Sequence, residues 1–216
     1  LRRVNMGISI APILIGPTYI FRNVWFDLEP HWIGADKGQY ELRWVKGGEG
    51  GTGHTYFFHN TVEISNRKVG STETGTGKEA VAAYGYSLSQ GGGAESTNIF
   101  SLNNIIQTDG PVVKNEVAYP KMDYDLIYNP MISTHRSVWG EWGGKSYGSP
   151  SNTNAQNFGL FRDGTGQLTN GIPGQASFVD RTNRDFNLAE GSLGIDKGVV
   201  IPGINDSNSK WAFQGN

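Results

Sequence analysis

The stretch Tyr56-Phe-Phe-His-Asn60-Thr-Val-Glu63 places one asparagine between two short runs of β-forming residues. Two other stretches resemble it, Tyr19-Ile-Phe-Arg-Asn23-Val-Trp-Phe26 and Phe100-Ser-Leu-Asn-Asn104-Ile-Ile106. Asn23 and Asn60 are 37 residues apart, and Asn60 and Asn104 are 44 residues apart. Repeats of about 20 to 50 residues are typical of proteins built from stacked coils. The three stretches therefore predict one structural unit that recurs along the chain.

A second β-forming segment precedes each of these stretches. These segments are Gly7-Ile-Ser-Ile10, Tyr40-Glu-Leu-Arg-Trp-Val45 and Ala80-Val-Ala-Ala-Tyr-Gly-Tyr86. No segment shows the apolar spacing of an amphipathic helix, whereas short runs rich in β-branched and aromatic residues recur between Gly, Pro and Asn clusters. We expect an all-β protein in which residues 7–129 form stacked parallel strands. An antiparallel sandwich is the alternative.

The recurring asparagine has a physical reason to lie at one bend of each unit. Asparagine tolerates left-handed backbone angles, and its amide group can both donate and accept hydrogen bonds. In a stack of coils such amides can form an internal ladder. The sequence therefore predicts that Asn23, Asn60 and Asn104 are aligned at equivalent bends.

Composition narrows the classes of partner. The chain has 31 Gly, and its 6 Trp, 9 Tyr and 10 Phe supply enough apolar area for a folded core. The formal net charge of −2 gives no general attraction to nucleic acid or to anionic lipid, so we expect neither partner. Without cysteine, disulfides and thiolate metal sites are excluded.

The N-terminal apolar run is too interrupted to be a membrane span. Pro12, Gly16 and Pro17 break the run around Ile8 to Ile15, and a span needs about 20 apolar residues. We interpret the run as a buried strand and expect no membrane insertion. Because the chain lacks an initiator Met, we expect that an N-terminal portion of the same protein is missing.

The first half resembles the right-handed parallel β-helix repeat proteins of the pectate-lyase-like group, through Gly16-Pro-Thr-Tyr-Ile-Phe-Arg-Asn23 and Phe58-His-Asn-Thr61. The tail is similar to their closing segment, through Ser177-Phe-Val-Asp180, Asp185-Phe-Asn-Leu188 and Gly191-Ser-Leu-Gly-Ile-Asp196. It departs from that pattern by lacking a Pro before Phe178 and by carrying Leu-Gly where Pro-Ala is common.

The resemblance implies a right-handed parallel β-helix, or solenoid, with long loops and an irregular closing segment. Residues 1–129 would form the coils, and residues 130–216 would form a loop-rich closing segment of the same domain. It further implies a secreted or cell-surface protein whose ligand is a polysaccharide. Such tails occur on proteins of several activities, so the likeness is specific for fold and weak for function.

One strand carries the candidate site. If Leu42 and Trp44 face the core, alternation sends Glu41 and Arg43 outward, where Glu41 becomes a candidate for substrate binding. We expect stacking to gather Ser9, Arg43 and Tyr84 in one row. A uronic-acid lyase needs a cation for the substrate carboxylate and a base for the proton at C5, which Arg43 could supply together with one of Lys46, Tyr84 and His54. The alternative is that these charges are solvated surface groups.

Aromatic rings and oxygen-rich turns supply further candidates. Trp32, Trp139 and Trp142 lie among Gly and polar residues, where rings can stack on sugars, although core packing explains them equally well. Calcium is the one possible cofactor, at Asp163-Gly-Thr-Gly166 or Asn205-Asp-Ser-Asn208, although both are more simply ordinary turns. Gly144-Lys-Ser146-Tyr-Gly148 matches a nucleophile motif, but we predict no helix after it, as that motif requires.

These observations lead to a carbohydrate-active protein that binds an acidic polysaccharide. Cleavage of that polysaccharide by β-elimination is one expectation, and it makes the chain lyase-like. A non-catalytic, adhesin-like surface fibre is the alternative.

Overall fold

The structure of the 216-residue chain is a computed structural model. It describes residues 6–10, 17–26, 31–32, 40–47, 54–64, 80–87, 99–108, 112–114, 121–129 and 139–206. For residues 6–10, 31–32, 40–47, 64, 80–87 and 114 the description covers the backbone and its strand pairing.

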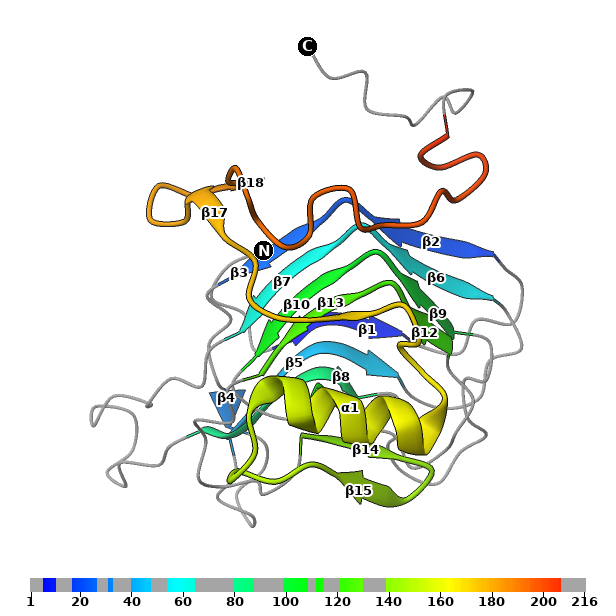
Figure 1. The fold of residues 1–216 in the computed structure, drawn as a ribbon, viewed down its shortest axis with the longest axis vertical. Coiled ribbons are helices and arrows are strands. Elements are labelled where there is room, and N and C mark those ends of the chain that lie inside the picture. Colours follow the sequence, from blue (N-terminus) through cyan, green and yellow to red (C-terminus); the bar gives the residue numbers. More distant parts are fainter. Residues whose placement is uncertain are drawn as a thin grey trace.

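Most described strands belong to three sheets, which we call sheets A, B and C (Figure 1). Sheet A runs β1 (Met6–Ile10), β5 (Tyr40–Gly47), β8 (Ala80–Ser87), β11 (Val113–Lys114), β14 (Gly140–Trp142) and β15 (Lys145–Tyr147), with β4 (His31–Trp32) paired to β5. Sheet B runs β2 (Thr18–Phe21), β6 (Thr55–Phe58), β9 (Ile99–Leu102) and β12 (Lys121–Asp123). Sheet C runs β3 (Val24–Phe26), β7 (Thr61–Ile64), β10 (Ile105–Thr108), β13 (Leu126–Tyr128) and β16 (Ile172–Pro173).

The chain visits the sheets in the repeating order A, B, C, and each new strand pairs parallel with the strand of the preceding unit. Within the three sheets, the antiparallel pairs among the described strands are β4 with β5 and β14 with β15. This arrangement is mostly β, parallel and consistent with a β-helix-like fold. It confirms the predicted stacked parallel strands, and it argues against the antiparallel sandwich.

Each recurring stretch forms two strands rather than one, because the backbone bends in front of the asparagine. The residue before each bend asparagine has a positive φ, namely 54° at Arg22, 54° at His59 and 60° at Asn103, and Tyr124 repeats this with 54°. Left-handed backbone was expected at the asparagines themselves, and that expectation was wrong by one residue. The left-handed residues form a column along the bend between sheets B and C.

The asparagine ladder is present at this bend. The backbone N–H and the Nδ2 of Asn23 donate to Oδ1 of Asn60 at 3.2 and 3.1 Å. Asn60 donates in the same two ways to Oδ1 of Asn104, at 2.9 Å each. Asn60 and Asn104 are buried, so each internal amide is satisfied by its neighbours in the stack. The predicted alignment of the three residues is confirmed.

The ladder has a fourth member that the sequence comparison missed. Asn104 donates from its backbone N–H and from Nδ2 to Oδ1 of Asp125, at 2.7 and 3.0 Å. Ser101 donates to the other carboxylate oxygen at 2.6 Å. A carboxylate can only accept when it is ionised, and the last residue of this ladder needs only to accept. The spacing of 21 residues from Asn104 to Asp125 is about half of the earlier spacings, which concealed the repeat.

One helix, α1 (Asn154–Thr165), covers the C-terminal end of the stack (Figure 1). Thr153 accepts from the backbone N–H of Gln156 while the Gln156 side chain accepts from the backbone of Thr153, which is a complete capping box. Phe158 and Phe161 of α1 are buried against Trp139 in the same core. The prediction that no helix follows Gly148 was therefore wrong.

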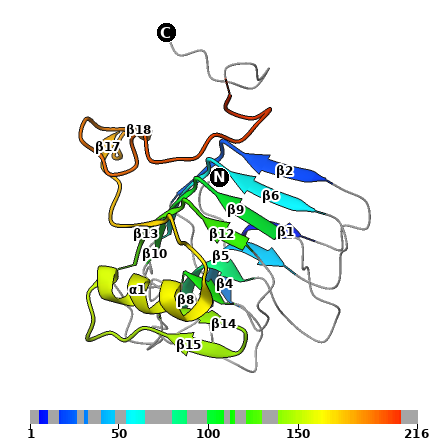
Figure 2. The same ribbon diagram turned by 45° about the vertical axis from the view of Figure 1, so that its right-hand side comes forward.

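The chain after the helix returns to the sheets and then crosses them. Because β14 pairs with β11 and β16 pairs with β13, the parallel sheets continue past residue 130. The division of the chain into coils before residue 130 and a closing segment after it stays a prediction. A small antiparallel pair, β17 (Phe178–Asp180) and β18 (Asp185–Leu188), follows. Residues 189–206 then run without regular structure across the bend between sheets B and C (Figure 2).

Candidate functional site

The predicted catalytic row lies on sheet A, and its register is only partly as expected. Arg43 pairs with Tyr84 on β8, so these two predicted residues are neighbours in the sheet. Ser9, however, pairs with Lys46, and the residue opposite Arg43 on β1 is Met6. The expected row of Ser9, Arg43 and Tyr84 is therefore wrong at Ser9, because the strands align three residues away from the predicted register.

Two further candidates, on β5 and β4, are placed by backbone pairing. Glu41 lies opposite Ala82 on β8 and opposite His31 on β4. Trp32 lies opposite Tyr40. The role of Glu41 and Trp32 in substrate binding stays a prediction.

His54 belongs to a different face from Arg43. It is exposed at the start of β6 and stacks on Tyr56 and Phe100 of sheet B, with ring centroids 6.0 and 5.8 Å apart. Tyr19 stacks on Tyr56 in turn at 5.2 Å, so the rings form a row across neighbouring strands. His54 is thus a member of an aromatic row on sheet B, and its register gives it no place beside Arg43 on sheet A.

The two tryptophans of the C-terminal half are core residues. Trp139 is fully buried, and its Nε1 donates to Oδ1 of Asn154 at 3.1 Å. Trp142 is also buried and packs edge-on against Phe161. The expectation that these two rings could stack on a sugar is corrected by their burial.

The calcium candidates form local contacts: Asp163 lies in the last turn of α1, and of the second candidate the structure describes Asn205 and Asp206, whereas Ser207 and Asn208 lie outside the described residues. Asp163 pairs with the neighbouring Arg162 at 2.9 Å. Asn205 accepts from the backbone N–H of Ile201, and Asp206 accepts from that of Gly203 at 2.9 Å. Among the residues that the structure describes, no cluster of three or more His, Asp or Glu side chains could hold a metal ion. Ser146 lies in the exposed strand β15 of a hairpin, without the strand-to-helix turn that a nucleophile motif requires.

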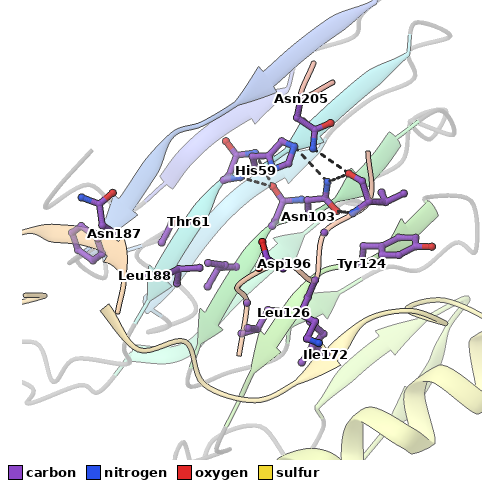
Figure 3. A pocket seen from close by; sticks show the side chains of 18 of the residues that line it. His59, Thr61, Asn103, Tyr124, Leu126, Ile172, Asn187, Leu188, Asp196 and Asn205 are labelled. Carbon is purple, nitrogen blue, oxygen red and sulfur yellow. Dashed lines mark hydrogen bonds between the residues drawn. The ribbon is translucent and has the colours of Figure 1, made fainter. Parts of the chain in front are cut away.

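A groove lies between the bend of sheets B and C and the C-terminal segment, with a volume of about 500 Å³ (Figure 3). The left-handed residues His59, Asn103 and Tyr124 line one side of it. Residues from β18 and from the following turns line the other side, among them Leu188 and Asp196. Volumes of this size are typical of small-molecule sites.

Asn103 fixes the outer wall of this groove. Its Nδ2 donates to the carbonyl oxygen of Val199 at 2.8 Å, and its Oδ1 accepts from the backbone N–H of Val199 at 2.8 Å. A Cβ on Gly198 would lie 3.1 Å from the Asn103 amide, so a larger residue there would have to push that amide outward by a few tenths of an ångström. Asn205 adds a hydrogen bond to the Val199 carbonyl at 3.2 Å.

The groove contains few charges. Burial lowers the pKa of His59, and the positive charge of Arg22 lowers it further, so His59 is neutral at pH 7. Asp196 and Lys197 are consecutive, exposed and of opposite charge. The groove therefore carries no net charge near neutral pH.

The sequence comparison did not identify this groove. Its wall depends on a contact between Asn103 and Val199, which are 96 residues apart, and no local pattern reports such a contact. One signal in the sequence could have indicated the groove. The residues that precede the ladder positions recur with the same spacing as the ladder, so they would lie together on the outer side of one bend.

Within the described residues, no helix combines the length and the apolar character needed to cross a bilayer. Comparison with known protein families, curated proteins and solved structures found no match to this chain.

Proposed function

We propose that the chain is a right-handed parallel β-helix, a solenoid of the pectate-lyase-like group. Three strands per unit, delivered in the order A, B, C, support this proposal. The ladder at one bend supports it further, because an amide ladder requires equivalent positions in successive coils. The tail motifs that resemble the closing segment of that group agree with it.

The function we propose is binding of an acidic polysaccharide along sheet A, at the surface of the cell or outside it. The observation that carries this proposal is the register of Arg43 with Tyr84 on adjacent parallel strands. Neighbouring strands lie about 4.8 Å apart, so a cation and a phenol occupy adjacent register positions. Lys46, flanked by Ser9 on β1 and Ser87 on β8, lies three positions further along the strand, where alternation assigns it to the opposite face of the sheet from Arg43.

Cleavage by β-elimination would use the same positions. Arg43 would neutralise the uronate carboxylate, which makes the proton at C5 more acidic. Tyr84 would accept that proton as the base, while the bond from C4 to the glycosidic oxygen breaks, a C4–C5 double bond forms and the departing oxygen takes a proton from water.

Two measurements separate binding from cleavage. Incubation with pectate, alginate and glycosaminoglycans tests cleavage, because each elimination produces an unsaturated uronide that absorbs ultraviolet light. Affinity electrophoresis in gels containing the same polymers tests binding without cleavage. Retardation without new absorbance would mean that the protein binds the polysaccharide and does not cleave it. If no polymer gave either retardation or new absorbance, the proposal would be refuted and the structural fibre would be favoured.

A further inference from the structure

The groove between the bend and the C-terminal segment presents polar groups that the fold does not use. Within the described part of the chain, the Thr61 hydroxyl, the Oδ1 of Asn187, the Asp196 carboxylate and the Lys197 ammonium make no hydrogen bond or ion pair. These groups include hydrogen-bond donors and acceptors. They come from β7, β18 and the turn after it, so several segments converge on one space.

The floor beneath these groups is apolar. Ile105, Leu126 and Leu188 line it, and Gly194 lies close above them. A Cβ on Gly194 would be 3.3 Å from a methyl carbon of Leu126 and 3.4 Å from one of Leu188. Figure 3 shows Leu188 and Asn187 on one side of the groove and Tyr124 on the other. The site thus combines an apolar surface with a polar rim, as small-molecule sites do.

Charge and rigidity narrow the class of ligand. Asp196 and Lys197 cancel, and the groove has no surplus charge that would select an ion. The paired hydrogen bonds of Asn103 with Val199 hold the wall in place, so the open volume does not depend on the ligand to form it. A ligand that matches such a rim and floor has many hydroxyl groups, apolar C–H faces and no charge.

We propose that this groove binds a neutral saccharide, with its hydroxyl groups on Thr61, Asn187 and Asp196 and its C–H face on the apolar floor. The site lies at the bend between sheets B and C, whereas the polysaccharide positions proposed above lie on sheet A. It therefore does not depend on that proposal.

Ligand-observed NMR titration of the whole chain tests the proposal. The neutral probes are cellotriose, mannotriose and triacetylchitotriose, and trigalacturonate is the charged comparison. Thr61→Phe fills the groove with a residue that suits a strand. Asp196→Asn removes the charge and keeps a side chain that tolerates the left-handed φ of 56° at this position. Glu190→Gln is the matched control, since Glu190 is exposed and outside the groove.

At least one neutral probe should bind at millimolar concentration or below. Thr61→Phe should abolish this binding, and Asp196→Asn should weaken it about tenfold, because a carboxylate accepts hydroxyl groups more strongly than an amide. Glu190→Gln should bind as the wild type does. Melting curves of all variants establish that they are folded, and if Thr61→Phe is not, Asp196→Asn against Glu190→Gln decides the matter.

Three results would overturn the proposal. One is that no neutral probe binds the wild-type chain at millimolar concentration. Another is that binding survives in both Thr61→Phe and Asp196→Asn. The third is that trigalacturonate binds more tightly than every neutral probe and is lost in Thr61→Phe, which would make the groove an anion site. If the proposed polysaccharide binding on sheet A proved wrong, the binding of neutral probes in the groove would still be expected.

Discussion

Replacing the buried Asp125 by Asn should change how the stability of the protein depends on pH. The side chain of Asp125 is fully buried and closes the amide ladder. Burial raises the pKa of its carboxyl from 3.8 to about 7, against the hydrogen bonds from Ser101 and Asn104, which lower it. The folded protein therefore holds a proton at pH values where the unfolded chain has released it.

The sign and size of the effect follow from this difference. Stability from the protonated carboxyl is fully present below pH 3.8, is lost progressively as the pH rises, and is gone above about pH 7. One pKa unit corresponds to about 1.4 kcal/mol, so the whole range amounts to about 4 kcal/mol. For a chain of this length, a loss of about 4 kcal/mol in the free energy of unfolding lowers the melting temperature by about 10 °C.

Urea unfolding at fixed ionic strength, followed by circular dichroism from pH 4 to pH 8, measures the effect. The free energy of unfolding of the wild type minus that of Asp125→Asn should fall by about 4 kcal/mol across this range. His59, whose lowered pKa contributes a slope of opposite sign, is common to both proteins and cancels. Asp163→Asn, a change on an exposed carboxylate, is the control. A difference that stays constant with pH would refute the reasoning.

Three other outcomes are expected. Asn60→Ala leaves Asn104 and Asn23 without their partner in the stack and should lower the free energy of unfolding by about 1 to 3 kcal/mol, so an unchanged urea midpoint would contradict the ladder. Arg43→Ala should weaken binding of anionic oligosaccharides about tenfold in calorimetric titration without changing the melting temperature, whereas the exposed control Arg162→Ala should not. Asn103→Ala should release the backbone N–H of Val199, and hydrogen exchange at that amide should accelerate; equal protection would mean that other contacts hold the tail.

The repeat was predictable because its cause is local. An amide that must donate and accept at the same time restricts a buried bend position to few residue types, and Asn23, Asn60 and Asn104 were visible for that reason. Asp125 was not, because the end of a ladder has no donor requirement and a carboxylate is sufficient there. A search for Asp as well as Asn in front of a pair of apolar residues would have found Asp125, which precedes Leu126 and Ile127.

The helix and the groove were hidden for different reasons. The buried apolar residues of α1, Phe158 and Phe161, are too few to give a periodic pattern, and its start is encoded instead by the capping pair Thr153 and Gln156. The groove depends on contacts across long sequence separations, which no periodicity records. The register of β1 was also predicted wrongly, because the sequence comparison aligned Ser9 with Arg43 by analogy between coils, whereas the strands pair Ser9 with Lys46. An offset of three residues is odd, so it also changes which residues of the two strands share a face.

The ladder also has a direction. Each amide receives hydrogen bonds on its oxygen from the preceding coil and donates from its nitrogen to the following one. The side-chain dipoles therefore add, and their positive end faces Asp125, much as aligned peptide dipoles favour an acidic residue at the start of a helix. A stack with more coils would hold that carboxyl in a stronger field although its immediate neighbours stayed the same. The hydrogen bonds from Asn104 that lower the pKa of Asp125 are thus the last in a column of amides that all point the same way.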